Sequence, residues 1–102
     1  MAEMPDLDEV VHQKTRLSVL TMLAETGSVS FTFLRDNLGL SDGNLSRHLR
    51  VLEEHGLVKI NKGYQGRKPH TTVSATKQGR AALADYLTAL EAMIERVRGA
   101  GS

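Results

Sequence analysis

The sequence predicts a mainly α-helical domain with one small β-hairpin (α+β), and two patterns carry this prediction. Apolar residues recur at the helical spacing of three and four through residues 7–55 and again after residue 76. Between them, residues 57–74 change to strand-like segments around a turn-rich stretch. A length of 102 residues argues for a single domain over residues 1–102, with a core at about 7–75 and a C-terminal helix at about 76–98.

Composition limits the classes of function. The chain has 13 basic and 12 acidic residues and a formal net charge of +1, so the overall charge says little about nucleic acid. The absence of cysteine excludes disulfides, thiolate metal sites and a cysteine nucleophile. No apolar run approaches the ~20 residues of a membrane span, and the N-terminus lacks the pattern of a signal peptide. We therefore expect a soluble, cytoplasmic protein.

The N-terminal quarter predicts helical structure before a first turn. Asp6 precedes Glu9 by three residues, a capping-box spacing that predicts a short helix through residues 10–12 with Asp6 as its cap. Thr15 can begin a second helix, which Gly27 ends. The pattern leaves open whether residues 6–26 form one bent helix or two. Residues 28–30 are too few for more than a fragment of strand.

Residues 30–56 predict two consecutive helices joined by a short turn. Ser30 can cap a helix of about two turns that ends at Gly39. Ser41 can cap a second helix, over residues 41–55, that ends at Gly56. A helix, a turn of about four residues and a second helix form the signature of a helix-turn-helix motif.

The helix at 41–55 has two chemically different faces. Leu45, Leu49 and Leu52 form one apolar stripe. The opposite face is small, polar and basic before the last turn; it carries Gly43, Ser46, Arg47 and Arg50, with Asn44 on the flank. A helix that enters the DNA major groove needs small residues for close approach, polar groups for base edges and cations for phosphates. An ordinary amphipathic surface helix is the alternative for this segment taken alone.

Residues 57–74 predict a β-hairpin with a loose, basic tip. The first strand begins at residues 57–60, the stretch GYQGRKP at 63–69 is rich in turn formers, and HTTVS at 70–74 is the second strand. From Lys59 to His70 the chain has no acidic residue and four basic ones, namely Lys59, Lys62, Arg67 and Lys68. Such a tip, directly after a recognition-type helix, can contact a phosphate backbone or enter a minor groove. A solvated turn is the alternative.

The last segment predicts a long helix with a dimer seam. Thr76 is its expected cap, the helix ends at Val97 or Arg98, and residues 99–102 are expected to be disordered. Apolar residues step along it by four and three from Leu83, the spacing of a coiled-coil seam. Packing of the whole helix on its own domain is the alternative. The residues predicted at a dimer interface are Leu7, Val10, Val11, Leu87, Leu90, Ile94 and Val97.

The order of these elements resembles the winged helix-turn-helix transcription regulators. The resemblance rests on LSDGNLSRHLRVLEEHGLV at 40–58 and KGYQGRKPHTTVSATKQGRAAL at 62–83, and it covers residues 7–97. The chain is similar to the short, stand-alone members related to the MarR and ArsR families. This resemblance implies a homodimeric repressor on double-stranded DNA. Carried over by position, it implies recognition-helix contacts from Ser41, Gly43, Asn44, Ser46, Arg47 and Arg50, and wing contacts from Lys62, Arg67 and Lys68.

The sequence departs from these families at their ligand sites. ArsR-type sensors hold metals through cysteines or paired histidines and carboxylates, whereas the histidines here are scattered at positions 12, 48, 55 and 70. We therefore predict no metal and no cofactor. His48 lies beside the apolar stripe, where it can bond backbone or phosphate. MarR proteins are usually longer and have a ligand pocket. A small-molecule effector is possible for this chain, but no residue in the sequence indicates one.

An enzymatic function is not expected. Asp42, Ser46 and His48 are residue types of a catalytic triad, but they lie on one exposed helix, and side chains two positions apart point about 200° from each other. A winged-helix module that binds other proteins, without DNA contact, is the alternative function. Its helix and hairpin would be expected to carry acidic or apolar patches, whereas this chain carries basic residues there.

Overall fold

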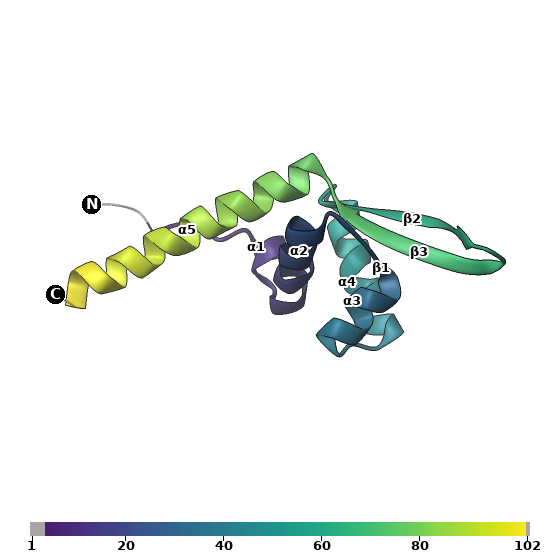
Figure 1. The fold of residues 1–102 in the computed structure, drawn as a ribbon. Helices are drawn as coiled ribbons and strands as arrows, with labels where there is room; N and C mark the ends of the chain where they lie inside the picture. The colour runs from purple at the N-terminus through teal and green to yellow at the C-terminus, as the bar shows by residue number, and fades with distance from the viewer. Residues whose placement is uncertain (1–3, 102) are drawn as a thin grey trace.

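A computed structural model describes residues 4–101, and over this range it confirms the predicted fold class (Figure 1). A short three-stranded sheet lies among helices, and a long C-terminal helix leaves the body in the direction opposite to the β-hairpin. In chain order the elements are α1 (Glu9–His12), α2 (Lys14–Thr26), β1 (Ser28–Ser30), α3 (Phe31–Leu38), α4 (Asp42–Glu54), β2 (Val58–Gln65), β3 (Lys68–Ala75) and α5 (Lys77–Gly101).

The core forms where α1, α2, α3, α4, the sheet and the start of α5 meet. The predicted stripe of α4 is its centre, because Leu45, Leu49 and Leu52 are all buried. Its buried apolar members are Val11, Val19, Leu20, Leu23, Leu34, Leu45, Leu49, Leu52, Leu57, Val58, Val73, Leu83 and Tyr86. Each such side chain contributes roughly 1.5–3 kcal/mol when it is removed from water. Among residues 4–101, no helix is long and apolar enough to cross a membrane.

The N-terminal region forms two helices rather than one bent helix. The cap of α1 is Asp8, not Asp6, because an oxygen of Asp8 accepts hydrogen bonds from the backbone N–H groups of Val10, at 2.8 Å, and Val11, at 3.1 Å. Gln13 separates the helices, and its side chain caps α2 by accepting from the backbone N–H of Arg16 at 2.9 Å. The second helix therefore begins one residue before the predicted Thr15.

Val11 was predicted at a dimer interface, and this prediction is wrong. Its side chain has an exposed fraction of 0% within its own chain, where it belongs to the core. A helix of four residues turns only one side toward the core, and the cap at Asp8 sets the helix so that Val11 lies on that side. Leu7 and Val10 remain partly exposed at the edge of the core.

The sheet is antiparallel, with strand order β1-β3-β2. Residues 28–30 do form a strand of only three residues, yet this strand pairs with β3 through Ser28–Ser74, Val29–Val73 and Ser30–Thr72. Val73 is fully buried at the middle of this pairing. The small strand therefore attaches the start of the helix-turn-helix motif to the base of the hairpin.

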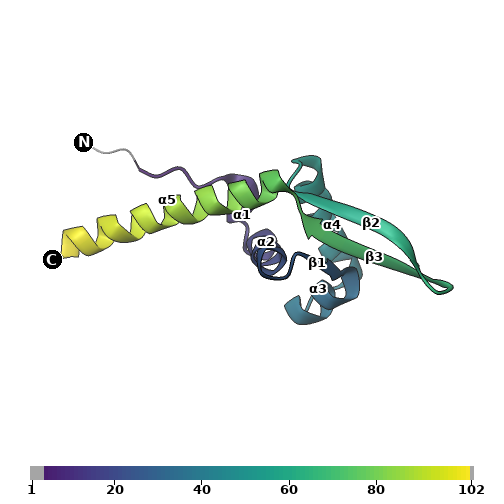
Figure 2. The same cartoon turned by 45° about the horizontal axis from the view of Figure 1, so that its top comes forward.

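The hairpin, called the wing below, is longer and more regular than predicted. Strands β2 and β3 pair without interruption from Val58–Ala75 to Gln65–Lys68, which leaves only Gly66 and Arg67 in the turn (Figure 2). Gly66 has a φ of +65°, and Gly at the first turn position suits a two-residue hairpin turn. The loose tip over 63–69 was therefore a wrong prediction. Pro69 is tolerated because β1 reaches only to Thr72, so β3 has an open edge at Pro69.

Helix α5 begins as predicted and ends later than predicted. The hydroxyl of Thr76 caps it by accepting from the backbone N–H of Gly79 at 2.9 Å. The helix then runs for 25 residues to Gly101, so residues 99–101 are helical and not disordered; Ser102 lies outside the described residues. At 1.5 Å per residue the helix is about 37 Å long. Its first half packs on α1, α2 and β3, and its second half extends past the body (Figure 1).

Candidate nucleic-acid interface

Helix α4 presents a polar and basic face because its apolar stripe is buried. Ser41 caps the helix, and its hydroxyl oxygen accepts from the backbone N–H of Asn44 at 3.1 Å. Among the recognition-helix residues predicted from the sequence, Asn44 is half-buried and the others are exposed: Ser41, Gly43, Ser46, Arg47 and Arg50. Gly43 has nothing within 4 Å of the position where a Cβ would stand, so the surface there is flat and open.

Arg47 and Asn44 form one unit on this face. The Arg47 guanidinium donates a hydrogen bond to the side-chain oxygen of Asn44 at 2.8 Å. The bond uses one of the five N–H donors of the guanidinium and limits the directions in which the others can point. The remaining donors can still make a bidentate contact with a base edge or a phosphate.

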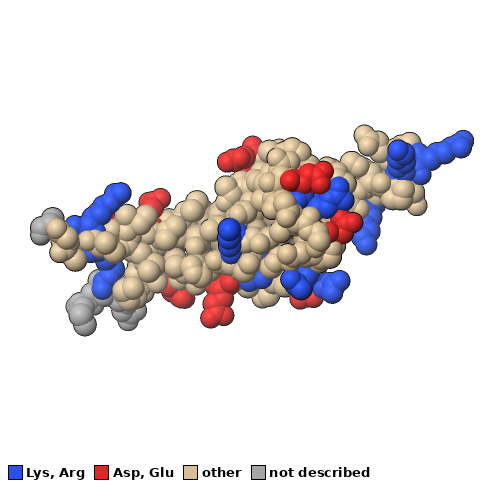
Figure 3. All heavy atoms as spheres, turned by 90° about the horizontal axis from the view of Figure 1, so that it is seen from below, with Lys and Arg blue, Asp and Glu red and all other residues tan. Residues whose placement is uncertain are grey.

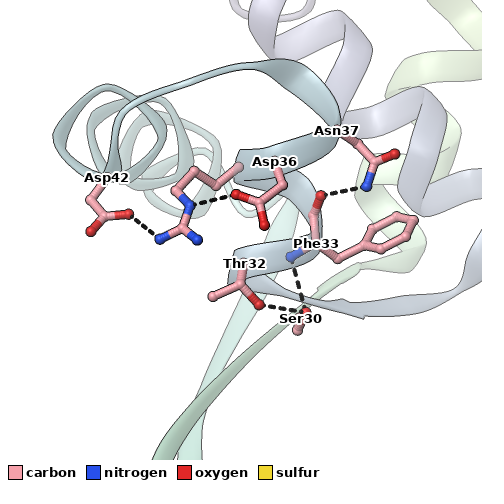
Figure 4. A network of polar contacts seen from close by, with 7 residues as sticks. Ser30, Thr32, Phe33, Asp36, Asn37 and Asp42 are labelled. Atoms are coloured by element: carbon pink, nitrogen blue, oxygen red, sulfur yellow. Dashed lines mark hydrogen bonds and ion pairs between the residues drawn. The ribbon is translucent and has the colours of Figure 1, made fainter.

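Arg35 joins the two helices of the motif. The sequence did not predict it as a residue of the site. It lies on α3, where its Nε donates to Asp36 at 2.9 Å and its Nη1 donates to Asp42 at 2.9 Å (Figure 4). Hydrogen bonds and charge from Asp36 and then Asp42 raise the pKa of the guanidinium. Arg35 therefore compensates the Asp42 carboxylate, the acidic group at the start of α4, and fixes α3 against α4 across the turn.

A groove of about 700 Å³ separates α4 from the wing. Ser46, Arg50 and Glu53 line its helix side, and Ile60, Lys62 and Thr71 line its wing side, while Phe31, Leu49 and Asp42 complete it. Arg50 and Lys62, both predicted from the sequence, thus border one groove from two elements. Thr71 and Phe31 were not predicted as site residues, because their place depends on how the sheet packs beside α4.

The three predicted wing residues do not share one face. Residues paired directly across an antiparallel ladder lie on the same side of the sheet, and successive residues alternate. Lys62 pairs with Thr71 and lies on the side of the groove, whereas Lys68 pairs with Gln65 and lies on the other side. Arg67 is in the turn itself. Figure 3 shows basic side chains at the far end of the wing.

His48 contacts an arginine rather than the backbone. The Nη1 of Arg16, on α2, lies 3.5 Å from the Nδ1 of His48 on α4. The Nε of Arg16 also donates to the carbonyl of Val10 at 2.7 Å, so Arg16 connects α1 to the recognition helix. Burial lowers the pKa of His48, and the charges of Arg16 and Arg47 lower it further. Among residues 4–101, no three His, Cys, Asp or Glu side chains are placed to hold a metal ion.

This lowered pKa predicts that acid destabilises the fold through His48. Because the pKa of His48 in the folded chain lies below the unfolded value of about 6.5, the unfolded chain binds more protons as the pH falls below that value. The neutral His48 therefore contributes fully to the free energy of unfolding above about pH 6.5, and this contribution is lost as the pH decreases. Urea unfolding from pH 7.5 to 5 should show a smaller loss for His48→Gln than for the wild type. Equal losses in the two proteins would contradict this assignment.

Comparison with known proteins agrees with the fold. A family model described as a winged helix DNA-binding domain matches residues 15–94. An uncharacterized protein of Methanocaldococcus jannaschii is 32% identical over 79 residues, which are 78% of this chain and 86% of that protein. The structure of a transcriptional regulator homologue from Pyrococcus horikoshii OT3 superposes with a TM-score of 0.83 at 32% identity, over 88% of this chain and 89% of that chain.

A more distant structure connects the fold to one of the families suggested by the sequence. A protein of Enterococcus faecalis V583, assigned to the MarR family of transcriptional regulators, superposes with a TM-score of 0.70 at 26% identity, over 90% of this chain and 82% of that chain. The resemblance predicted from the sequence is thus confirmed. The chain belongs to the winged helix DNA-binding domain family, whose fold serves DNA-binding regulation rather than enzymatic catalysis.

Proposed function

We propose that this protein is a cytoplasmic, homodimeric repressor that binds a specific sequence of double-stranded DNA. The main support is that Ser46 and Arg50 of α4 border one groove together with Lys62 of the wing, while Arg47 is exposed on the same helix. In this proposal, α4 enters the major groove and reads base edges. One sugar–phosphate strand follows the groove between α4 and the wing, where Arg50 and Lys62 neutralise its charge.

The dimer in this proposal forms along the second half of α5. Three apolar side chains of this seam are exposed in the single chain. Their exposed fractions are 43% for Leu87, 41% for Ile94 and 74% for Val97. Met4 also lies here, since a shallow hollow is lined by Met4, Met93, Arg96, Val97 and Ala100. A partner helix would cover this surface, with Leu7, Val10 and Leu90 at its edge. Two α4 helices held by such a pair could meet successive major grooves, about 34 Å apart.

Fluorescence anisotropy with labelled duplexes tests the proposed DNA binding. The purified protein should bind the promoter of its own gene more tightly than a random duplex, with an affinity that falls steeply as salt rises, because phosphate neutralisation releases counterions. Repression follows if occupation of that promoter lowers transcription of a reporter. Weak binding that ignores both salt and sequence would refute DNA binding and direct attention to protein partners.

Arg47→Ala should separate base reading from phosphate contact. If the guanidinium is bidentate to a guanine, the variant should lose about 1–3 kcal/mol of affinity for the promoter duplex and less for a random duplex. Lys68→Ala is the comparison, since a phosphate contact should weaken binding to both duplexes about equally. Equal losses on both duplexes for Arg47→Ala would show that Arg47 does not read bases.

A further inference from the structure

The face of the wing that continues the core ends in an uncovered aromatic residue. Along β2, Val58 is buried, Ile60 is half-buried, Lys62 is exposed at the groove, and Tyr64 has an exposed fraction of 77%. These four residues alternate with the others of the strand and so lie on one side of the sheet. A fully covered tyrosine buries roughly 150–250 Å², so Tyr64 has a large apolar area that the described residues 4–101 leave uncovered.

Tyr64 does not stand alone on this face. The ladder pairs it directly with Pro69, so a ring from each strand lies on the same side of the wing. Both residues are exposed, and the Gly66–Arg67 turn follows immediately beyond them. Tyr64 and Pro69, called the apolar tip below, therefore form a small ridge on the groove side, farther from the body than Lys62.

The charges around the apolar tip indicate what covers it. From Val58 to Ala75 the chain contains no acidic residue, while Lys62 lies on the same face and Arg67 lies in the turn. A protein partner recognised by apolar contact alone would gain nothing from this surrounding positive charge. A nucleic-acid duplex fits both features, because its phosphates are anionic and the deoxyribose walls of its minor groove are apolar. The tip also lies on the continuation of the groove proposed for one sugar–phosphate strand.

We propose that the apolar tip packs against deoxyribose in the minor groove next to the bound major groove, with Tyr64 as an affinity determinant that acts without charge. This inference rests on the proposed DNA binding and adds a residue to it. The phenol ring contacts the sugar walls, while Lys62 and Arg67 pair with the phosphates on either side. Apolar side chains in the minor groove are a known mode of DNA contact.

Salt dependence distinguishes this contact from a phosphate contact. Tyr64→Ala should weaken binding to the promoter duplex about tenfold at every salt concentration, because it removes buried apolar area from the contact and leaves the number of charges unchanged. The slope of log affinity against log salt should not change. Lys62→Ala should instead make that slope shallower by about 1. Tyr64→Phe should keep the affinity, and Gln65→Ala, a change on the opposite face, should have no effect.

Hydroxyl-radical footprinting locates the contact, since this reagent attacks deoxyribose along the minor groove. The wild type should protect sugars beside the major-groove site, and Tyr64→Ala should lose only that flanking protection. A variant that binds and protects like the wild type would overturn the role of Tyr64 while the proposed DNA binding stands. A shift of Tyr64→Ala to another oligomeric state would also overturn it, by placing Tyr64 at a protein contact. Failure of the wild type to bind any duplex would refute both proposals.

Discussion

Replacing Gly79 with alanine should lower the free energy of unfolding by about 3 kcal/mol, a large share of the roughly 5–15 kcal/mol that stabilises a typical domain. Gly79 is buried at the start of α5, where the helix passes directly over the backbone of Leu57. A Cβ on residue 79 would lie 2.8 Å from the carbonyl carbon of Leu57 and closer still to the carbonyl oxygen. Both atoms belong to the backbone and cannot rotate away as a side chain could.

Hydrogen bonds hold this crossing in place from both sides. The carbonyl of Leu57 accepts from the backbone N–H of Thr76 at 3.1 Å, and the Thr76 hydroxyl donates to the carbonyl of Gly56 at 2.6 Å. The backbone N–H of Gly79 donates in turn to the Thr76 hydroxyl oxygen at 2.9 Å. Relief of the clash would therefore break at least one bond at the point where α4, β2 and α5 join.

The same substitution elsewhere in α5 is a matched control. Gly99→Ala adds a Cβ with nothing within 4 Å, so we expect a gain of up to about 1 kcal/mol from the better helix propensity of alanine. Urea denaturation followed by circular dichroism measures both variants. A Gly79→Ala protein as stable as the wild type would show that the backbones of α5 and Leu57 are not held this close.

The features that sequence reasoning predicted correctly are those decided within a few residues. Ser30, Ser41 and Thr76 cap their helices as expected, since a cap depends only on a side chain and an N–H two or three positions later. The exposed face of α4 follows from its leucine stripe in the same way. The cap of α1 could not be decided locally, because Asp6 and Asp8 are equally good residue types and only the burial of Val11 selects between them.

The features that could not be predicted depend on segments far apart in the chain. Gly63 and Pro69 are local turn signals, yet the register of the ladder overrides them and places the turn at Gly66 and Arg67. The Arg16–His48 contact joins residues 32 positions apart, and no pattern in the sequence indicates it. The groove at the site likewise exists only because the sheet packs beside α4. The close approach of Gly79 to the backbone of Leu57 also joins residues 22 positions apart, and it appears only in the folded chain.

Ile94→Glu should convert the proposed dimer into a monomer and weaken DNA binding about 100-fold or more. Ile94 has an exposed fraction of 41% and lies on the half of α5 that extends past the body, so its replacement should not disturb the core. A dimer buries this side chain against its partner, and a carboxylate placed there would lose its hydration without a counter-charge. A dimer that binds two half-sites has an affinity roughly 10²–10⁴ times that of one subunit on one half-site. Dissociation into monomers would remove this gain.

Ala92→Glu provides the control for added charge. Residue 92 is exposed, and it lies about 200° around the helix from residue 94. Sedimentation velocity should give the mass of a single 11.2 kDa chain for Ile94→Glu and twice that mass for the wild type and Ala92→Glu. Leu90→Glu is a poorer test, since Leu90 packs against the core and its loss could unfold the domain. An intact Ile94→Glu dimer would place the interface elsewhere. A monomeric wild type with full promoter affinity would instead show that each chain binds DNA alone.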